Sequence, residues 1–571
     1  MRYYAFACDF DGTLAFQGKV NGKTLSALER LRNSGRKLIL VTGRILDDLI
    51  YIFPHINIFD RVIAENGAVI YRPFLREEKL LCERLPEKLA FELCKKGVDS
   101  LSVGQSIIST IQPYETKVLE TVRDLGIEAQ LIFNKGAVMV LPSGVNKSTG
   151  LRAALDELGL SHHNTVGIGD AENDHSFLSI CEFSVAVANA LPSLKERVDY
   201  VAGVDHGDGV IEIIDKLLDN DLSGFPSKSD QHLILLGKSK EGKEVRVRPY
   251  NTSILLSGTS GSGKSTFAAG FLERLSEYGY QFCIIDPEGD YLTLDDAVVI
   301  GGSKQVPVVD EVVKLLDKPE QNCVVNMLGV TLADRPAFFD ILLSSLLELR
   351  SRTGRPHWIV IDETHHLISS HLTPSDILSI PKDLSGMLFI TVHPDHLPRV
   401  ILSEINIIFV IGESSKQAIN AFSEILGQAP PSIPPVKLEP GEAIAWWRKP
   451  PLDPFWFRSI PPRSERRRHL LKYAEGKLGI DKSFYFRGPE MKLKLRAHNL
   501  VLFTQMADGI DDDTWMYHLH RGDYSRWLKE SIKDDCLAKE IEDIEQMNGI
   551  TPEKSRSLIK EKIEKRYTGP T

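Results

Sequence analysis

Nine consecutive residues in the middle of the chain have types and spacing that suit binding to the phosphates of a nucleotide. An apolar run at residues 253–256 precedes them and another at residues 267–272 follows, so the pattern predicts a strand, a glycine-rich turn and a helix. Backbone N–H groups of such a turn can surround phosphate oxygens, and the beginning of the helix adds partial positive charge. Lys264 can reach the β- and γ-phosphates, and the hydroxyl of Ser265 can bind Mg²⁺. The predicted ATP-binding residues of this turn are Gly258, Thr259, Ser260, Gly261, Ser262, Gly263, Lys264, Ser265 and Thr266.

Two carboxylates near the N-terminus, Asp9 and Asp11, have the spacing needed for phosphoryl chemistry. They follow the apolar run 3–8, which predicts a strand that places them at its carboxyl end, where open α/β sheets hold their sites. One carboxylate could act as nucleophile and the other as general acid, with a cation between phosphate and protein.

The run Asp9-Phe10-Asp11-Gly12-Thr13 resembles the signature of the haloacid dehalogenase (HAD) superfamily of phosphatases. Three further motifs follow in that family's order: a strand that ends at Thr42, a lysine at position 147, and an acidic turn after residues 166–169. The resemblance implies that Asp9 becomes phosphorylated and that Asp11 donates the proton to the leaving group. It also implies Mg²⁺ at Asp9, Asp11, Asp170 and Asp174, and phosphate binding by Thr42, Lys147 and Asn173.

The segment between the second and third motifs is long enough to form a small inserted domain. The Cof-like branch of the superfamily inserts its cap at this place, and residues 65–68, Glu-Asn-Gly-Ala, resemble that branch as well. A cap controls substrate choice by closing over the site. Its expected size resembles the caps of phosphoglycolate and sugar phosphatases, which implies a small phosphate ester as the substrate.

A second α/β pattern carries further acidic residues at predicted strand ends. The strand at 282–285 leads into Asp-Pro-Glu-Gly-Asp-Tyr at 286–291, and the strand at 358–361 leads into Asp362 and Glu363. Asp362 suits holding Mg²⁺ through water, and Glu363 suits polarising the water that attacks the γ-phosphate. A fourth strand, 388–394, has a polar end at the position of a γ-phosphate sensor.

Together these motifs resemble HerA/FtsK-type ATPases, a branch of the RecA-like P-loop machines, with the Asp-Pro-Glu-Gly-Asp-Tyr run as the discriminating feature. The resemblance implies ATP hydrolysis and a homo-oligomer, such as a ring of six, in which an arginine of one subunit reaches the nucleotide of its neighbour. Arg350, Arg352 and Arg355 are candidates on an exposed-looking loop, and a solvated basic loop is an equally good interpretation.

The end of the chain predicts no function. Aromatic and proline residues at 446–457 and basic residues at 463–469 could bind single-stranded nucleic acid, although a linker packed by its aromatics is the commoner explanation. His518 and His520 lie near acids but lack a third ligand at a suitable spacing, so packing and capping is the better interpretation.

Composition narrows the class of protein. The 571 residues carry a net charge of -10, which argues against bulk electrostatic wrapping of nucleic acid. The seven cysteines are scattered and never in C-x-x-C spacing, so we expect reduced thiols and no zinc site built from cysteines. We expect a cytoplasmic protein without signal peptide, transmembrane helix or membrane partner.

The sequence thus predicts an α/β multidomain protein. It comprises a HAD Rossmann-like core with an inserted α+β cap, a RecA-like P-loop ATPase domain and a mostly helical C-terminal region. The expected boundaries are 1–73 and 144–219 for the phosphatase core, 74–143 for the cap, 220–231 for a linker, 232–460 for the ATPase and 461–571 for the C-terminal region.

The predicted function is a bifunctional one, a Mg²⁺-dependent phosphomonoesterase joined to a HerA-like ATP hydrolase. Two alternatives stay open at this point. The first is a nucleic-acid end-processing phosphatase and kinase, against which Glu363 argues because kinases must avoid activating water. The second is a sensor or scaffold gated by ATP, in which turnover is incidental.

Overall fold

The structure is a computed structural model of the whole chain. It describes all residues except 135, 226–231, 369–382, 413–414, 434–436, 450, 464–482, 491–492, 533, 548 and 568–571. Half of the expected linker and most of the basic stretch at 463–469 therefore lie outside the described residues. Among the residues that are described, no helix has both the length and the apolar character to cross a membrane.

The chain forms two compact units. The first comprises Met1–Lys264, Arg274–Leu292 and Asp296–Ile460, and it contains the two large sheets. The second comprises Ser265–Glu273, Thr293–Asp295 and Pro461–Thr571.

The first large sheet has eight strands in the order β12-β11-β10-β1-β2-β3-β4-β5. Its centre is parallel, with β1 between β10 and β2, and β4 and β5 join antiparallel at one edge. The strands are β1 (Ala5–Asp9), β2 (Lys37–Val41), β3 (Arg61–Ala64), β4 (Val69–Arg72), β5 (Glu77–Leu80), β10 (Thr165–Gly169), β11 (Phe183–Ala186) and β12 (Tyr200–Val201).

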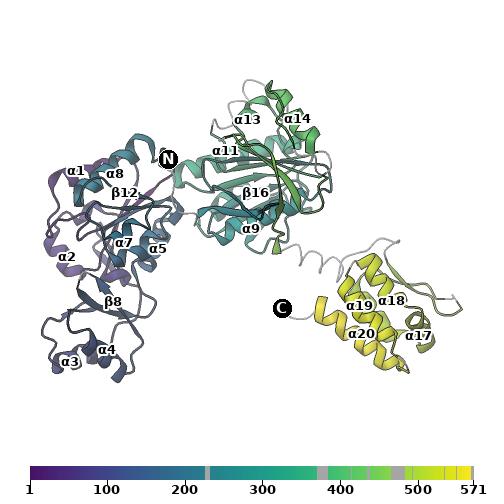
Figure 1. Cartoon of the computed structure of the whole chain (residues 1–571), viewed down its shortest axis with the longest axis horizontal. Helices are drawn as coiled ribbons and strands as arrows, with labels where there is room; N and C mark the ends of the chain where they lie inside the picture. Colours follow the sequence, from purple (N-terminus) through teal and green to yellow (C-terminus); the bar gives the residue numbers. More distant parts are fainter. Residues whose placement is uncertain are drawn as a thin grey trace. The chain divides into compact units, whose positions relative to one another are not determined.

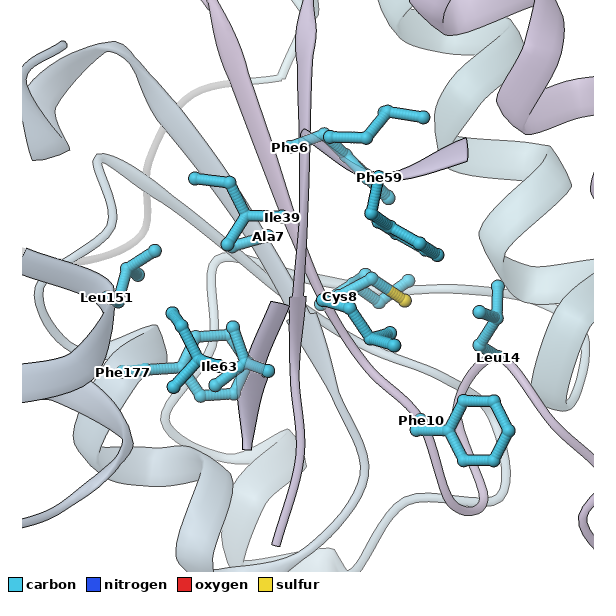
Figure 2. Packing of buried hydrophobic residues seen from close by; sticks show 14 of the residues in the cluster. Phe6, Ala7, Cys8, Phe10, Leu14, Ile39, Phe59, Ile63, Leu151 and Phe177 are labelled. Carbon is cyan, nitrogen blue, oxygen red and sulfur yellow. The ribbon is translucent and has the colours of Figure 1, made fainter. Parts of the chain in front are cut away.

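Strand β1 is buried along its whole length because it has apolar neighbours on both faces. Figure 2 shows Phe59 and Leu14 on one side of it and Leu151 and Phe177 on the other. Helix α1 (Gly22–Asn33) packs with α8 (His206–Asn220), and α5 (Lys147–Leu158) packs against β2 and β3. This packing holds the carboxyl end of β1 in a fixed position.

The segment between β5 and α5 forms a small α+β layer with an antiparallel sheet in the order β6-β7-β9-β8 (Figure 1). Its strands and helices are β6 (Ser102–Val103), β7 (Ile108–Ile111), β8 (Ala129–Asn134), β9 (Ala137–Pro142), α3 (Glu87–Lys95) and α4 (Glu115–Asp124). Leu89, Val118 and Val140 belong to its own hydrophobic core. Strand β8 contacts the turn η4 (Glu172–Asp174) of the neighbouring large sheet, so this layer reaches the acidic motif.

The second large sheet has eleven strands in the order β14-β13-β23-β22-β21-β15-β20-β19-β16-β18-β17. Seven strands, from β21 to β17, run parallel, and the other four are antiparallel. The parallel strands are β15 (Ser253–Gly258), β16 (Phe282–Asp286), β17 (Ala297–Gly301), β18 (Asn322–Asn326), β19 (Trp358–Ile361), β20 (Met387–Thr391) and β21 (Ile407–Ile411). The main helices are α9 (Lys264–Glu277), α10 (Val309–Leu316), α11 (Arg335–Thr353), α13 (Arg399–Glu404) and α14 (Ser415–Leu426).

The interpretation of residues 446–457 as a linker packed by aromatics is wrong. These residues contribute to β22 (Glu442–Trp447) and β23 (Phe455–Ser459), which extend the sheet beside β21, with β13 (Ile234–Ser239) and β14 (Glu244–Val247) at the edge. The aromatic side chains pack across the strands, and the rings of Trp447 and Phe455 stack with centroids 5.4 Å apart.

The described residues from 483 onward are mainly helical, as predicted. They form β24 (Phe484–Phe486), β25 (Leu495–Ala497), α16 (Leu500–Gly509), α17 (Asp512–His520), α18 (Asp523–Trp527), α19 (Asp535–Glu545) and α20 (Pro552–Tyr567). Helix α20 is not simply exposed, because its Ile559 and Ile563 are buried in the core of this region. The histidine His518 bonds Asp523 at 2.8 Å, which agrees with a packing role.

Candidate active sites

Two neighbouring strands bring the first set of carboxylates together. Asp9 is the last residue of β1, and Asp170 directly follows β10, which lies parallel beside β1. Asp174 comes from the turn η4 that follows, and its carboxylate accepts the N–H groups of Asp170 and Ala171. Carboxylate oxygens of Asp9, Asp170 and Asp174 all lie within 4.8 Å of one another, and the three residues are buried.

A buried lysine pairs with two of these carboxylates. Lys147 is the first residue of α5, and Asn146 caps that helix by accepting the N–H groups of Ser148 and Thr149. The Nζ of Lys147 lies 2.6 Å from Oδ1 of Asp9 and 2.5 Å from Oδ1 of Asp174. The cap therefore fixes the position from which the ammonium reaches both acids.

The cluster contains more carboxylates than positively charged groups. Burial, followed by repulsion from Asp174, raises the pKa of Asp9 well above its usual value, although Lys147 opposes the shift. One ammonium faces three carboxylates, and all donor atoms are hard oxygens of the kind that Mg²⁺ prefers. Asp9, Asp170 and Asp174 therefore fit a divalent cation, which would supply the missing positive charge.

Asp11 is held apart from this cluster. Its two carboxylate oxygens accept hydrogen bonds of 2.6 Å from Nε and Nη2 of Arg44, in a bidentate ion pair. The side chain of Asp11 is 46% exposed, unlike the buried cluster. In this structure its carboxylate therefore contacts a guanidinium rather than the group of carboxylates.

The two other predicted phosphate-binding side chains also lie at this edge of the sheet. Thr42 follows β2, is buried, and its Oγ1 accepts the N–H of Arg44 at 3.1 Å. Asn173 donates from Nδ2 to Oδ1 of Asn66 at 3.1 Å. Its own Oδ1 is buried and has no hydrogen-bond partner among the described residues, so it remains an available acceptor.

Sequence reasoning assigned no role to several residues that support the site. Thr13 donates to Oδ1 of Asp170 at 3.2 Å, and Asn189 donates to the carbonyl of Gly12 at 2.7 Å. His206 bonds the same carbonyl at 2.7 Å. Asn189 and His206 lie more than 170 positions after Gly12, near the end of the phosphatase region, and they hold the loop that carries Asp11.

Glu65 connects the main sheet to the small α+β layer. It is buried and has a φ of +51°, a value that non-glycine residues rarely adopt. Its carboxylate accepts N–H groups of Gln105, Ser106 and Ile107 at 2.9, 2.8 and 3.1 Å. A Cβ at Gly104 would lie 2.6 Å from this carboxyl group, so only glycine permits the approach. Sequence reasoning included Glu65 in the motif at residues 65–68 but assigned no role to its side chain.

The predicted nucleotide-binding turn follows β15 at the centre of the second sheet. Gly261 and Gly263 have φ values of +73° and +101°, and Lys264 then begins α9. A Cβ at Gly258 would lie 2.4 Å from the carbonyl oxygen of Ile411, which shows how closely this turn packs on β21. The geometry is that of a strand, a tight turn and a helix, as the spacing predicts.

Lys264 has no carboxylate within ion-pair distance among the described residues. Its Nζ lies 3.3 Å from the carbonyl oxygen of Thr259, a residue of the same turn. Lys264 is buried, with only 6% of its surface exposed. Because its ammonium lies within the turn, its charge is close to the backbone groups that would surround a phosphate.

The predicted acidic pair follows β19. Oδ1 of Asp362 accepts the N–H of Glu363 at 2.8 Å, and burial, with repulsion from Glu363 and Asp286, raises the pKa of Asp362 to about 8. Oε2 of Glu363 is buried, and no hydrogen-bond partner is found for it in the described part of the chain. A buried acceptor without a donor is costly, so this oxygen is suited to a water or ligand.

Asp286 serves a structural role at the end of β16. Its carboxylate accepts the N–H groups of Gly289, Asp290 and Tyr291 at 2.8, 3.1 and 3.1 Å. These bonds fold the Asp-Pro-Glu-Gly-Asp-Tyr run into a tight turn next to the acidic pair.

The expectation of an exposed basic loop is wrong for two of the three arginines. Arg350 donates to the carbonyls of Pro356, His357, Ser385 and Gly386 at 2.8 to 3.3 Å. Arg355 is fully buried, and burial lowers its pKa to about 10. Only Arg352 is exposed, where it pairs with Asp317. Arg350 therefore binds backbone carbonyls just before β19 and β20, and Arg355 lies in the interior, so neither is part of an exposed loop.

Comparison with known families matches two regions of the chain. Residues 6–105 and 111–214 match the model of haloacid dehalogenase-like hydrolases. Residues 238–378 match the model described as the central domain of helicase HerA.

Curated relatives cover the first of these regions. The phosphoglycolate phosphatase of Methanothermobacter thermautotrophicus is 30% identical over 223 residues, which are 38% of this chain and 98% of that protein. The phosphoglycolate phosphatase 2 of Saccharolobus solfataricus is 32% identical over 227 residues, which are 37% of this chain and 91% of that protein. A solved haloacid dehalogenase-like hydrolase from Bacteroides thetaiotaomicron is 19% identical, with a TM-score of 0.34, over 38% of this chain and 99% of its own.

Proposed function

The chain belongs to the haloacid dehalogenase-like hydrolases, and from this premise we propose that it hydrolyses small phosphate monoesters with Asp9 as the nucleophile. The observation that supports this proposal is the buried cluster in which Lys147 contacts Asp9 while Asp170 and Asp174 lie beside it. We propose the boundaries given by the motifs for the phosphatase core, its cap and the ATPase.

The reaction needs two steps at Asp9. An oxygen of its carboxylate attacks phosphorus, the ester P–O bond breaks, and Asp11 in its protonated form gives a proton to the leaving oxygen. Asp11, now a carboxylate, takes a proton from the water that attacks the aspartyl phosphate, and inorganic phosphate leaves. Because Arg44 holds Asp11 in the structure, Asp11 must leave that ion pair to act as the acid.

The surrounding residues manage the negative charge of the phosphate. Lys147 faces Asp9 and would contact the transferring group, while the hydroxyl of Thr42 and the second N–H of the Asn173 amide, whose first donates to Asn66, could donate to phosphate oxygens at the same edge. When Mg²⁺ is bound by Asp9, Asp170 and Asp174, it offsets the negative charge shared by nucleophile and phosphate.

The small α+β layer serves as the cap in this proposal, and the names of the relatives suggest phosphoglycolate as the first substrate to test. The assay compares 2-phosphoglycolate, sugar phosphates and phosphorylated DNA ends, with Mg²⁺ or with EDTA. Asp9→Asn keeps the volume and removes the anionic nucleophile, so turnover should fall at least about 10³-fold. Asp47→Asn, an exposed aspartate on α2 (Leu46–Ile52), is the matched control. Turnover that survives Asp9→Asn or EDTA would contradict the assignment.

As a second activity we propose ATP hydrolysis by a RecA-like domain with Lys264, Ser265, Asp362 and Glu363. The supporting observation is the buried Oε2 of Glu363, which has no hydrogen-bond partner among the described residues. Burial raises the pKa of Glu363 and the charge of Lys264 opposes that rise, so the two side chains interact. Glu363 would accept a proton from the water that attacks the γ-phosphate, and Lys264 would contact the β- and γ-phosphates.

The assay for this second activity also separates it from the alternatives. Lys264→Ala should weaken ATP binding because it removes a charge from the phosphates. Transfer of labelled γ-phosphate to a 5′-hydroxyl DNA end would favour the end-processing kinase. We also propose a homo-oligomer whose ATPase rate per subunit rises with concentration. A monomer by light scattering, with and without ATP, would refute the oligomer.

A further inference from the structure

Four histidines gather beside the proposed ATPase site. The turn η6 (Thr364–His366) follows β19, and the turn η7 (Pro394–His396) follows β20. Because these strands are parallel neighbours, their carboxyl ends bring the two turns together. The ring of His365 lies 5.6 Å from that of His393 and 6.5 Å from that of His396, measured between centroids.

Three of the side chains in these turns already have the spacing of metal ligands. Nδ1 of His393 lies 3.8 Å from Oδ1 of Asp395, and Nε2 of His396 lies 3.8 Å from Oδ2 of the same residue. Adjacent ligands of a tetrahedral Zn²⁺ lie roughly 3.4 Å apart, given Zn–N bonds of about 2.0 Å. Small side-chain rotations would therefore close the three donors around one ion.

The site is open to solvent. The side chains of His393, Asp395 and His396 are 51%, 53% and 54% exposed, so an ion can reach them. The rings of His393 and His396 stack with centroids 4.7 Å apart. Neutral imidazole is the form that binds metals.

The geometry points to a binding site for a transition cation such as Zn²⁺, formed by His393, Asp395 and His396. Two imidazoles and one carboxylate favour Zn²⁺, Co²⁺ or Ni²⁺ over Mg²⁺, which prefers oxygen ligands. The site adjoins the end of β20, where the γ-phosphate sensor is predicted, and it shares no residue with the turn that carries Lys264 or with the acidic pair Asp362 and Glu363.

His365 connects this site to the proposed catalytic glutamate. Its Nδ1 lies 3.4 Å from Oε2 of Glu363 and 3.2 Å from Oγ1 of Thr391. Burial and the neighbouring histidines lower the pKa of His365 to about 4, so its ring is neutral at pH 7. A metal ion at the site places positive charge near Glu363, which should weaken Glu363 as a base and slow ATP hydrolysis. This effect on turnover rests on the proposed ATPase function, whereas metal binding does not.

The test uses Co²⁺ as a spectroscopic probe of the full chain. The protein is titrated in excess Mg²⁺, which occupies the carboxylate sites, and the visible absorption of bound Co²⁺ is recorded. We expect one strong equivalent with the bands of a low-coordinate nitrogen and oxygen site, which Zn²⁺ displaces. His393→Ala with His396→Ala should abolish this equivalent, and His396→Gln should weaken it at least about 10-fold.

The control is His55→Ala, an exposed histidine of the phosphatase region, which should leave the Co²⁺ signal unchanged. Phosphatase turnover and circular dichroism report whether each variant folds. Equal Co²⁺ binding by the wild type and the double variant, or displacement of Co²⁺ by Mg²⁺, overturns the proposal. ATP hydrolysis in excess Mg²⁺ should fall on addition of Zn²⁺ in the wild type and not in the double variant. If binding is lost in the variant but turnover never depends on Zn²⁺, the site stands and its link to Glu363 is refuted.

Discussion

In the first site Lys147 contacts two buried carboxylates, whereas in the second site Lys264 contacts only a backbone carbonyl oxygen among the described residues. Both lysines are the first residue of a helix. The helix of Lys147 follows β9 of the small antiparallel sheet, whereas the helix of Lys264 follows β15 at the centre of the second large sheet. The two sites therefore share a lysine at a helix start and differ in the strand that leads to it and in its partners.

The difference separates a site that is already assembled from one that its ligand completes. Asp9, Asp174 and Lys147 hold one another in place before any substrate arrives. The buried Oε2 of Glu363 has no lysine or arginine partner and makes no hydrogen bond in the described chain, and burial raises the pKa of Asp362 to about 8. Nucleotide and its cation would satisfy these groups on binding.

The largest expected effect is on stability, and it distinguishes the two lysines. Lys147→Met leaves two buried carboxylates without their partner, so the free energy of unfolding should fall by about 3–5 kcal/mol. Lys264→Met breaks no ion pair found among the described residues, so stability should change by less than about 1 kcal/mol. Thermal denaturation in EDTA measures both.

Mg²⁺ provides the control for this pair of variants. Because the cation replaces part of the lost positive charge, it should recover part of the stability of Lys147→Met. Equal destabilisation by the two substitutions would remove the distinction between the assembled and the ligand-completed site.

Glu363→Gln should lower ATP turnover by about 10²–10³-fold, because the amide cannot accept a proton from water. Nucleotide binding should persist, and the new amide can itself hydrogen-bond, so stability should not fall. A fluorescent ATP analogue measures binding, and phosphate release measures turnover. Phosphatase turnover is the internal control, and a matching loss of binding would refute the assigned role.

Glu65→Gln tests the contact between the phosphatase sheet and its proposed cap. The carboxylate accepts three backbone N–H groups, and the amide oxygen is a weaker acceptor whose NH₂ group would face N–H donors. We expect kcat/KM to fall by about 10-fold for a small phosphate ester, with ATP turnover unchanged. Glu77→Gln, on exposed strand β5, is the matched control, and an equal effect there would exclude a specific contact.

The smallest effect concerns acid stability. Hydrogen bonds from Arg72, with those from Arg61 and Lys79, lower the pKa of Glu157 to about 2 from its usual 4.5. Because the folded pKa is the lower one, this stabilisation is complete above pH 4.5 and is lost as the pH falls towards 2.

Glu157→Gln should therefore cost about 1 kcal/mol at pH 7 and much less near pH 2. Glu157 lies near the end of α5, the helix that begins with Lys147. We therefore expect the substitution to change phosphatase turnover and to leave ATP turnover unchanged. Melting curves of wild type and variant that stay parallel from pH 7 to pH 2 would contradict this assignment.

Sequence reasoning predicted the positions of candidate residues correctly where these residues end a strand or follow it within a short motif. Asp9, Asp170, Lys264 and Asp362 all belong to short motifs whose position relative to the strand is fixed by local chain geometry. Their positions in the sheets could be predicted because parallel strands end at one edge.

Partners that depend on distant segments could not be predicted. Arg44 meets Asp11 across 33 positions, and Glu65 meets Ser106 across 41. Arg350 was misread because a charged residue before a strand is usually solvated, whereas here four carbonyls satisfy it. The aromatic run 446–457 was misread because proline and tryptophan concealed the alternation of an antiparallel pair.

Strand order determines which elements meet at the second site. Strand β20 lies between β15, which leads to Lys264, and β19, which leads to Glu363. Two spacings of about 4.8 Å place the ends of the outer strands roughly 10 Å apart. Burial raises the pKa of Glu363 and Lys264 opposes that rise, so the two side chains bridge enough of this separation for their charges to interact. A nucleotide bound at this edge would place its phosphates between groups that arrive from three neighbouring strands.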